Sequence, residues 1–244
     1  WSAGTFNNAG SDTQNVTLDQ SEDNNTKLLL HFNGAEGATS TTDFSNANHS
    51  ITFVGDANIS EGQFKLGNAS AGFDGTGDSL SVPDHADWNF GSGDFTIDLW
   101  VRHAAYLNDA LLYGQYNGNY EYNEWFYQSS TSMYFTGRDT GGMIIQELFT
   151  IPAVSNDVWY HMALVRSGSN LHLFVDGVEA ANSPKSVSGS LADIASSMSI
   201  AYNVGRLALN GYIDEFRISK GVARWTADFT PPTQEYPTDF VPSG

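Results

Sequence analysis

Asp214 is the residue whose type and position in this 244-residue chain most clearly suggest chemistry. Period-two counting along the stretch 211–219 puts it on one strand face with Tyr212, Phe216 and Ile218. A carboxylate among large apolar side chains is costly to bury unless a cation or several backbone N–H groups pair with it. The stretch therefore predicts a β-strand with a candidate metal ligand, and backbone donors are the alternative partner.

A second group suited to chemistry is the aromatic cluster at positions 113–127, which is interleaved with Gly, Asn and Gln. Aromatic rings with polar handles suit sugars, which present apolar C–H faces and hydroxyl rims. Large aromatic side chains also form cores, and alternation separates the set containing Tyr122 from the set containing Trp125. One set is expected in the core and the other beside a ligand. The candidate carbohydrate-binding residues are Tyr116, Tyr120, Tyr122, Trp125 and Arg138.

Catalytic patterns are absent from the sequence. Glu121 and Glu124 are three positions apart, so a regular strand directs them to opposite faces, where they cannot flank one glycosidic bond. His161 and His172 have no nearby Ser or Asp pattern of a triad. No Gly-rich phosphate loop connects a strand to a helix. The chain is therefore not expected to be an enzyme.

The strong negative charge narrows the classes of partner. The formal net charge is −18 at pH 7. Such a surface repels nucleic acids and anionic membranes, so nucleic-acid binding is not expected. Membrane insertion is not expected either, because no apolar run is long enough to span a bilayer. It attracts divalent cations, although acidity alone also keeps a protein soluble. The absence of cysteine excludes disulfides and zinc-thiolate sites.

Many short strands separated by Gly-rich turns must position these residues, which predicts an all-β, two-sheet antiparallel jelly-roll β-sandwich. Residues 1–26 are expected to form an extended arm or linker, residues 27–230 the folded domain and residues 231–244 a C-terminal tail. One short helix is expected at 220–227. Strands are expected at 27–32, 51–54, 64–66, 79–83, 95–102, 110–116, 121–128, 132–137, 143–148, 159–166, 171–175, 178–180, 197–202 and 211–219.

A series of short motifs occurs in a fixed order along the chain. They are Phe73-Asp74-Gly75 followed by the stretch 78–83, Asp94-Phe95-Thr96-Ile97 with Trp100-Val101, the stretches 158–163 and 173–177, and Gly211-Tyr212-Ile213-Asp214-Glu215-Phe216-Arg217-Ile218. The ordered set resembles the laminin-G-like, concanavalin A-like lectin/glucanase jelly-roll family. The resemblance implies two curved sheets packed face to face, a bound calcium ion in many members and frequent carbohydrate binding.

The resemblance also implies a calcium site. Asp214 is similar to the family's calcium-binding aspartate, with backbone carbonyl ligands expected around Asn33 and Gly67, and Asp43 resembles a loop aspartate of the family. Calcium takes six to eight oxygen ligands and accepts carbonyls, so one or two carboxylates suffice.

The remaining acidic residues have simpler interpretations. Glu215 and Arg217 are expected to form a surface pair of little energetic weight. Asp74 and Asp78 are interpreted as turn residues, with a second cation site as the alternative.

The sequence thus predicts a non-catalytic carbohydrate-binding or adhesion module, stabilised by structural calcium, on an extracellular, cell-surface or virion-surface protein. A glycan or polysaccharide and protein partners in a larger assembly are the expected ligands. The alternative is a structural, decoration or protein–protein interaction domain without a sugar ligand.

Overall fold

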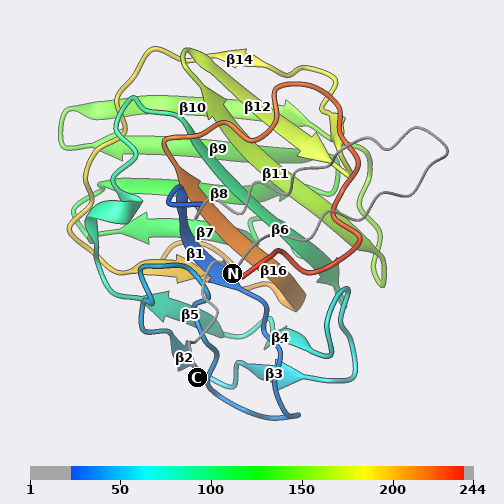
Figure 1. Ribbon diagram of the computed structural model, residues 1–244. Coiled ribbons are helices and arrows are strands. Elements are labelled where there is room, and N and C mark those ends of the chain that lie inside the picture. Colours follow the sequence, from blue (N-terminus) through cyan, green and yellow to red (C-terminus); the bar gives the residue numbers. More distant parts are fainter. Residues whose placement is uncertain (1–22, 239–244) are drawn as a thin grey trace, which may run out of the picture.

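A computed structural model describes residues 23–238, which form two antiparallel sheets packed face to face (Figure 1). Sheet A contains nine strands in the order β13 (Val178–Glu179), β12 (Asn170–Val175), β11 (Trp159–Ser167), β6 (Phe95–His103), β16 (Asn210–Lys220), β4 (Ser70–Asp74) and β3 (Asn58–Ser60), with β1 (Thr26–Leu30) beside β16 and β14 (Lys185–Ser186) beside β12. Sheet B contains seven strands in the order β10 (Gly142–Thr150), β9 (Ser132–Asp139), β8 (Tyr122–Ser129), β7 (Leu111–Tyr116), β15 (Met198–Ile200), β5 (Ser79–Val82) and β2 (Thr52–Val54). The all-β sandwich predicted from the sequence is confirmed.

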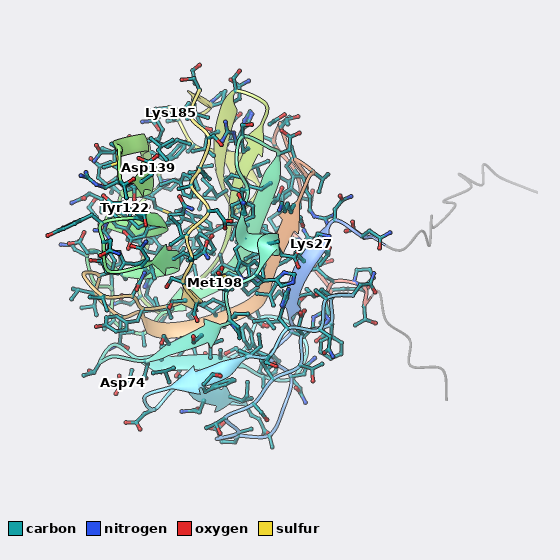
Figure 2. All side chains as sticks on the ribbon, turned by 90° about the vertical axis from the view of Figure 1, so that its left-hand side faces the viewer. Lys27, Asp74, Tyr122, Asp139, Lys185 and Met198 are labelled. Atoms are coloured by element: carbon teal, nitrogen blue, oxygen red, sulfur yellow. The ribbon has the colours of Figure 1, made fainter. Side chains whose placement is uncertain are left out.

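The core lies between the sheets because inward-facing apolar side chains alternate with outward-facing polar ones. On β6, Phe95, Ile97 and Leu99 enter the core, whereas Asp98 lies on the outer face of sheet A. In Figure 1, β6, β11 and β16 cross in front of β7–β10. Figure 2 shows the sandwich from the side, with Tyr122 of sheet B opposite Lys27 of sheet A. Each sheet therefore has one outer face, directed away from the core.

The hairpin of β11 and β12 is the element that the sequence indicates most clearly. Six consecutive residue pairs join the two strands, from Met162–Val175 to Ser167–Asn170. Asp176 and Gly177 follow β12 with positive φ angles of 50° and 76°, as a two-residue turn into β13 requires. The predicted turn is confirmed.

β16 contains a β-bulge at the candidate metal ligand. Its register against β6 shifts between Asp214 and Arg217, and Glu215 has a φ of +50°. An extra residue inverts the alternation of the side chains that follow it. Asp214 therefore lies opposite Trp100 on the outer face, whereas Phe216 packs in the core. The expectation that Asp214 shares a face with Phe216 and Ile218 is wrong for this reason.

Residues 221–238 lie along the outer face of sheet A and appear in red in Figure 1 up to residue 238. Trp225 and Phe229 stack with ring centroids 4.0 Å apart and cover an apolar cluster on β11 and β12 formed by Ala163, Val165 and Phe174. The helix expected at 220–227 does not form. β16 instead continues to Lys220, and Gly221 then turns the chain with a φ of +83°.

Two further local expectations are wrong. The stretch 64–66 is not a strand, because the N–H groups of Lys65 and Leu66 donate to the Asp214 carboxylate. β3 and β4 were not among the expected strands, since Asn, Ala and Gly favour strands weakly. The only helix in the described part of the chain is the 3-10 turn η1 (Ala86–Trp88), and no helix there is long and apolar enough to cross a membrane.

Candidate functional site

The outer face of sheet B carries the predicted sugar-binding residues that remain accessible. The registers of β7, β8 and β9 place Tyr116 beside Tyr122 and Tyr122 beside Arg138. We call these three residues the tyrosine row. All three side chains are partly exposed. The row therefore puts two aromatic rings and one guanidinium group side by side across three adjacent strands.

An ion pair lies next to the tyrosine row. Glu124 accepts hydrogen bonds from Nε and Nη2 of Arg206 at 2.9 and 2.8 Å, and the Arg206 guanidinium lies 3.5 Å from the ring centroid of Phe126. Burial raises the pKa of the Glu124 carboxyl, and the Arg206 guanidinium offsets only part of that effect. Gly114 leaves room for the loop that carries Arg206, because a Cβ atom there would lie 3.3 Å from Asn203 Nδ2.

Three polar atoms around this face are buried without a hydrogen-bond partner among the described residues. They are Thr136 Oγ1, Arg138 Nε and Asn203 Nδ2. Thr136 pairs with Glu124 across β8 and β9, so its side chain belongs to the same outer face. Buried polar groups normally find partners, and unpaired ones call for an explanation. Ligand hydroxyl groups could supply the missing partners.

The structure separates the predicted sugar-binding residues. Tyr116, Tyr122 and Arg138 lie side by side, whereas Tyr120 lies in the connection between β7 and β8, with 71% of its surface exposed. Trp125 is 0% exposed and packs in the core, so its predicted contact with a sugar is wrong. Alternation explains the difference, because Trp125 points to the opposite side of β8 from Tyr122.

The face also contains residues that the sequence did not indicate. Phe126, Tyr134 and Arg206 complete it, since Phe126 pairs with Tyr134 and Arg206 covers Phe126. Phe126 belongs to the aromatic cluster at 113–127, and the alternation of β8 places it on the same face as Tyr122. Arg206 has no signal in the sequence, because a long connection brings it back to β8.

Asp214, the leading metal candidate, is fully buried and paired with backbone donors. Its Oδ2 accepts the N–H groups of Lys65 and Leu66 at 2.8 and 2.9 Å, and its Oδ1 accepts that of Glu215 at 2.9 Å. Burial raises the pKa of Asp214 to about 7, against the lowering effect of the N–H bonds. These contacts correspond to the alternative interpretation from the sequence, in which backbone N–H groups pair with Asp214. The carboxylate thereby holds the loop of Lys65 and Leu66 against β16.

Oxygen donors gather close to Asp214, around Gly67. The donor atoms of His31, Glu215 and Glu235 all lie within 4.8 Å of one another. Gly67 has a φ of +64°, and a Cβ atom there would run into side-chain oxygens of Asn33 and Glu235. We call Asn33, Glu215 and Glu235 the oxygen cluster. Carboxylate and amide oxygens are the ligands that calcium prefers, so the oxygen cluster fits calcium, whereas the His31 nitrogen that lies against Glu215 is not a calcium ligand.

Glu215 is not the surface residue that the sequence predicted. It is fully buried, with Oε1 2.5 Å from His31 Nδ1 and Oε2 accepting the N–H of Tyr236 at 2.9 Å. Arg217 is also buried and pairs with Asp98. The predicted surface pair of Glu215 and Arg217 is therefore wrong, because the bulge and residues 221–238 enclose both side chains.

Asp43 anchors a loop instead of joining the oxygen cluster. Its carboxylate accepts the N–H groups of Leu29, Ser45 and His49 at 3.0, 2.9 and 2.8 Å. In the part of the chain that the structure describes, no hydrogen bond joins Asp43 to Asp214 or to Asn33.

Asp74 and Asp78 act as turn residues, as the sequence favoured. Asp78 is buried and accepts the N–H groups of Asp56 at 2.7 Å and Asp74 at 2.9 Å, and Asp74 accepts that of Thr76 at 2.7 Å. Both carboxylates line a pocket of about 420 Å³ between β3, β4 and β16.

The outer face of sheet A holds an aromatic pocket of about 620 Å³. Trp100, Trp159 and Lys65 line it together with residues 230–233. Lys65 Nζ lies 4.1 Å from the ring centroid of Trp100, and Trp100 Nε1 is buried with no hydrogen-bond partner among the described residues. We call this the sheet A pocket.

A buried ionic network holds the same sheet face together. Arg217 donates from Nε and Nη2 to the two Asp98 oxygens at 3.0 and 3.3 Å, and the Tyr236 hydroxyl donates to Asp98. His161 Nε2 lies 3.6 Å from Asp98 Oδ2. Burial would raise the pKa of Asp98, but the nearby Arg217 and His161 outweigh burial and lower the pKa to about 2.

The fold and the sequence together define the class of this protein. The family described as the concanavalin A-like lectin/glucanases superfamily matches residues 74–226, and the chain therefore belongs to it. A comparison with curated proteins finds no match.

Solved structures with similar folds include binding domains of toxins and one domain of an arabinanase. The binding domain of Paraclostridial Mosquitocidal Protein 1 has a TM-score of 0.61 and 18% identity over 81% of this chain and 49% of that one. Domain 4 of AbnA, an extracellular GH43 arabinanase from Geobacillus stearothermophilus in complex with arabinotriose, has a TM-score of 0.54 and 15% identity over 82% of this chain and 95% of that one. Botulinum neurotoxin type C, which depends on two ganglioside molecules to enter cells, has a TM-score of 0.57 and 14% identity over 81% and 48%. The chain spans about half the length of the toxin structures. At these identities the similarity shows the fold.

Proposed function

We propose that this domain is a non-catalytic carbohydrate-binding module that binds a glycan on the outer face of sheet B. The observation that carries the proposal is the tyrosine row, which lies beside the unpartnered buried atoms Thr136 Oγ1, Arg138 Nε and Asn203 Nδ2. Tyr116 and Tyr122 offer ring surfaces to the C–H faces of a sugar. The three polar atoms are shielded from solvent, so their side chains would have to shift on binding for these atoms to reach its hydroxyl groups.

The arrangement favours binding over hydrolysis. Cleavage of a glycosidic bond normally needs two carboxyl groups that flank the bond. Glu124 lies on the face but pairs with Arg206, and Glu121 is bonded to Asn117 in the turn between β7 and β8. Among the described residues, β8 thus has one carboxylate on this face, Glu124, and the guanidinium group of Arg206 already pairs with it. The superfamily includes glucanases, so polysaccharide hydrolysis is the outcome that an activity assay must exclude.

The structural neighbours support glycan binding. The arabinanase domain is in complex with arabinotriose, and the type C neurotoxin interacts with gangliosides. These are properties of those proteins, and the low identities transfer only the fold. An extracellular, cell-surface or virion-surface location follows as part of the same proposal, because free polysaccharides and glycolipids are met there.

Calcium is proposed as a structural ion of the domain. The oxygen cluster of Asn33, Glu215 and Glu235 would hold it beside Gly67, and the ion would tie residues 231–238 to sheet A. Asp214 would support the site by fixing the loop that contains Lys65 and Leu66. Asp43 contributes only through its own loop. A rise in Tm with calcium that is lost in Glu235→Gln would support this assignment, and equal melting curves in calcium and EDTA would refute it.

A glycan array followed by calorimetry on the best ligand tests the proposed function. Tyr122→Ala should weaken binding by about 5- to 150-fold, if stacking of a sugar on one aromatic ring is worth as much as that of a nucleic-acid base, about 1–3 kcal/mol. Trp159→Ala, at the sheet A pocket, is the matched aromatic control and should leave the affinity unchanged. Loss of binding in Trp159→Ala alone would move the site to sheet A and contradict the proposal.

The alternative function is a structural or protein-interaction domain of a larger surface assembly. It is favoured by the apolar side chains Val204 and Leu207, which are 65% and 50% exposed beside Arg206, and by Met143 and Leu148 on the exposed edge strand β10. No binding to any glycan, together with self-association in light scattering that Leu207→Ser abolishes, would favour this alternative.

A further inference from the structure

Two histidines and one aspartate meet at a place that the proposed glycan and calcium sites do not use. His49 lies in the connection between β1 and β2, and His85 and Asp87 lie around η1, after β5. His85 is the N-cap residue of η1. Two segments that are distant in the sequence thus bring three ligand-type side chains together.

The distances between the three side chains are close to those of a metal site. His49 Nε2 and His85 Nδ1 lie 3.1 and 3.0 Å from Asp87 Oδ2, and the three atoms all lie within 4.8 Å of one another. The ligand atoms of a tetrahedral zinc ion, at bond lengths of about 2.0–2.1 Å, are about 3.3 Å apart. Small side-chain rotations would therefore admit an ion between them.

The hydrogen bonds of His85 leave a conflict that a cation resolves. Nδ1 of His85 accepts the N–H of Asp87 at 3.2 Å and also lies 3.0 Å from Asp87 Oδ2. A ring nitrogen either carries a proton or offers one lone pair, so it cannot serve both contacts. If it accepts the N–H, an unprotonated nitrogen faces a carboxylate oxygen. A metal ion bound by Nδ1 and Oδ2 replaces that repulsion with two bonds, and the Asp87 N–H then gives up its bond to Nδ1, because the metal takes the single lone pair.

One side of the site packs against the protein, and the side that carries His85 is open to solvent. The His49 ring packs on Trp88 with centroids 4.7 Å apart, and the backbone N–H of His49 is bonded to Asp43. The side chains of His49 and Asp87 are 10% and 16% exposed, whereas that of His85 is 51% exposed. An ion could therefore enter from solvent past His85, and water could complete its coordination.

We propose that His49, His85 and Asp87 bind a transition-metal ion of the zinc class. Two imidazole nitrogens and one carboxylate suit zinc, whereas calcium prefers oxygen ligands alone. The donor set is thus distinct from the oxygen cluster. The ion joins the connection before β2 to the segment after β5, and it stabilises this corner of the sandwich because its ligands come together only in the folded chain.

Calorimetric titration of the full chain with Zn²⁺, after EDTA treatment and without a histidine tag, tests the proposal. One ion per chain is expected, and Co²⁺ should give the visible absorption of a tetrahedral site. His85→Ala and Asp87→Asn should each weaken Zn²⁺ binding at least about tenfold. Asp84→Asn, an exposed neighbour outside the cluster, is the matched control and should bind as the parent does.

The melting temperature in EDTA identifies variants that fail for lack of folding. His85→Ala is the decisive variant, because its half-exposed ring contributes little to packing, and in EDTA it should stay folded with a Tm only slightly below that of the parent, since it loses the cap of η1. Excess Ca²⁺ should leave Zn²⁺ binding unchanged. The proposal is overturned if the folded parent does not bind Zn²⁺, or if His85→Ala and Asp87→Asn bind it as tightly as the parent.

Discussion

Replacing Asp98 by asparagine tests how the outer face of sheet A is held together. Asp98 is fully buried and pairs with Arg217, Tyr236 and His161. Its pKa is lowered to about 2 from 3.8. That difference corresponds to about 2 kcal/mol of stability at neutral pH. Asp98→Asn also leaves the Arg217 guanidinium buried without its counter-ion, which typically costs about 3–5 kcal/mol.

The lowered pKa of Asp98 also predicts in which direction the stability difference changes with pH. Because the pKa of Asp98 is lower in the folded state, its stabilisation is present above about pH 4 and is lost as the pH falls toward 2. Urea unfolding followed by tryptophan fluorescence should show a loss of about 3–5 kcal/mol in Asp98→Asn at pH 7. The gap between the variant and the parent should shrink by about 2 kcal/mol at pH 2.

Two results would refute this reasoning. One is a loss below about 1 kcal/mol at pH 7, the range of exposed ion pairs. The other is a loss that does not change with pH. The double variant Asp98→Asn with Arg217→Met should recover part of the stability, since it removes the unpaired charge. Asp84→Asn, at an exposed position, controls for the general effect of net charge.

Three further substitutions have expected outcomes. Trp125→Ala should lower the free energy of unfolding by about 3–5 kcal/mol in urea, because it empties a core position, and a loss under about 1 kcal/mol would contradict its packing. Gly67→Ala should cost about 1–3 kcal/mol, since its φ is +64° and the Cβ meets Asn33 and Glu235, and it should reduce any calcium-dependent rise in Tm; unchanged melting curves would speak against the oxygen cluster. His103→Phe should make stability less dependent on pH. Burial lowers the pKa of His103 to about 4, so as the pH falls the histidine takes up a proton in the unfolded chain before it does so in the folded one. The parent should therefore lose about 3 kcal/mol of stability between pH 6.5 and 4, and the variant should not. An NMR titration in which the His103 ring protonates near pH 6.5 would disprove this.

The regular strands could be predicted because their side chains alternate or their turns are marked. β6, β11 and β12 have clear patterns, and Asp176-Gly177 marks the turn that follows β12. β3 and β4 could not, because Ser70, Ala71 and Gly72 form a strand only through pairing with neighbours such as β16. Where local preference is weak, the sheet decides the structure.

The candidate sites were predictable only in part. Alternation separated Tyr122 from Trp125 but could not tell which of the two faces the core. The bulge at Glu215 has no sequence mark, since a glycine or asparagine is the usual sign of a positive φ. It displaced Asp214 from its expected face and buried Glu215. Glu235 could not be connected to Asn33, because its segment has no periodic pattern.

Both limits of the described part of the chain lie on the same side of the sandwich. Asp23 is bonded to Arg224, and Tyr236 is bonded to Asp98, so both limits of the described chain lie on sheet A. A partner that holds the domain through the segments next to Asp23 and Tyr236 would therefore lie on the side of sheet A. The tyrosine row lies on the far side of the sandwich, with Tyr122 opposite Lys27 in Figure 2. In such an orientation the attachment side and the presenting side are separated by the full thickness of the protein, and a ligand as bulky as a polysaccharide can approach without meeting the support.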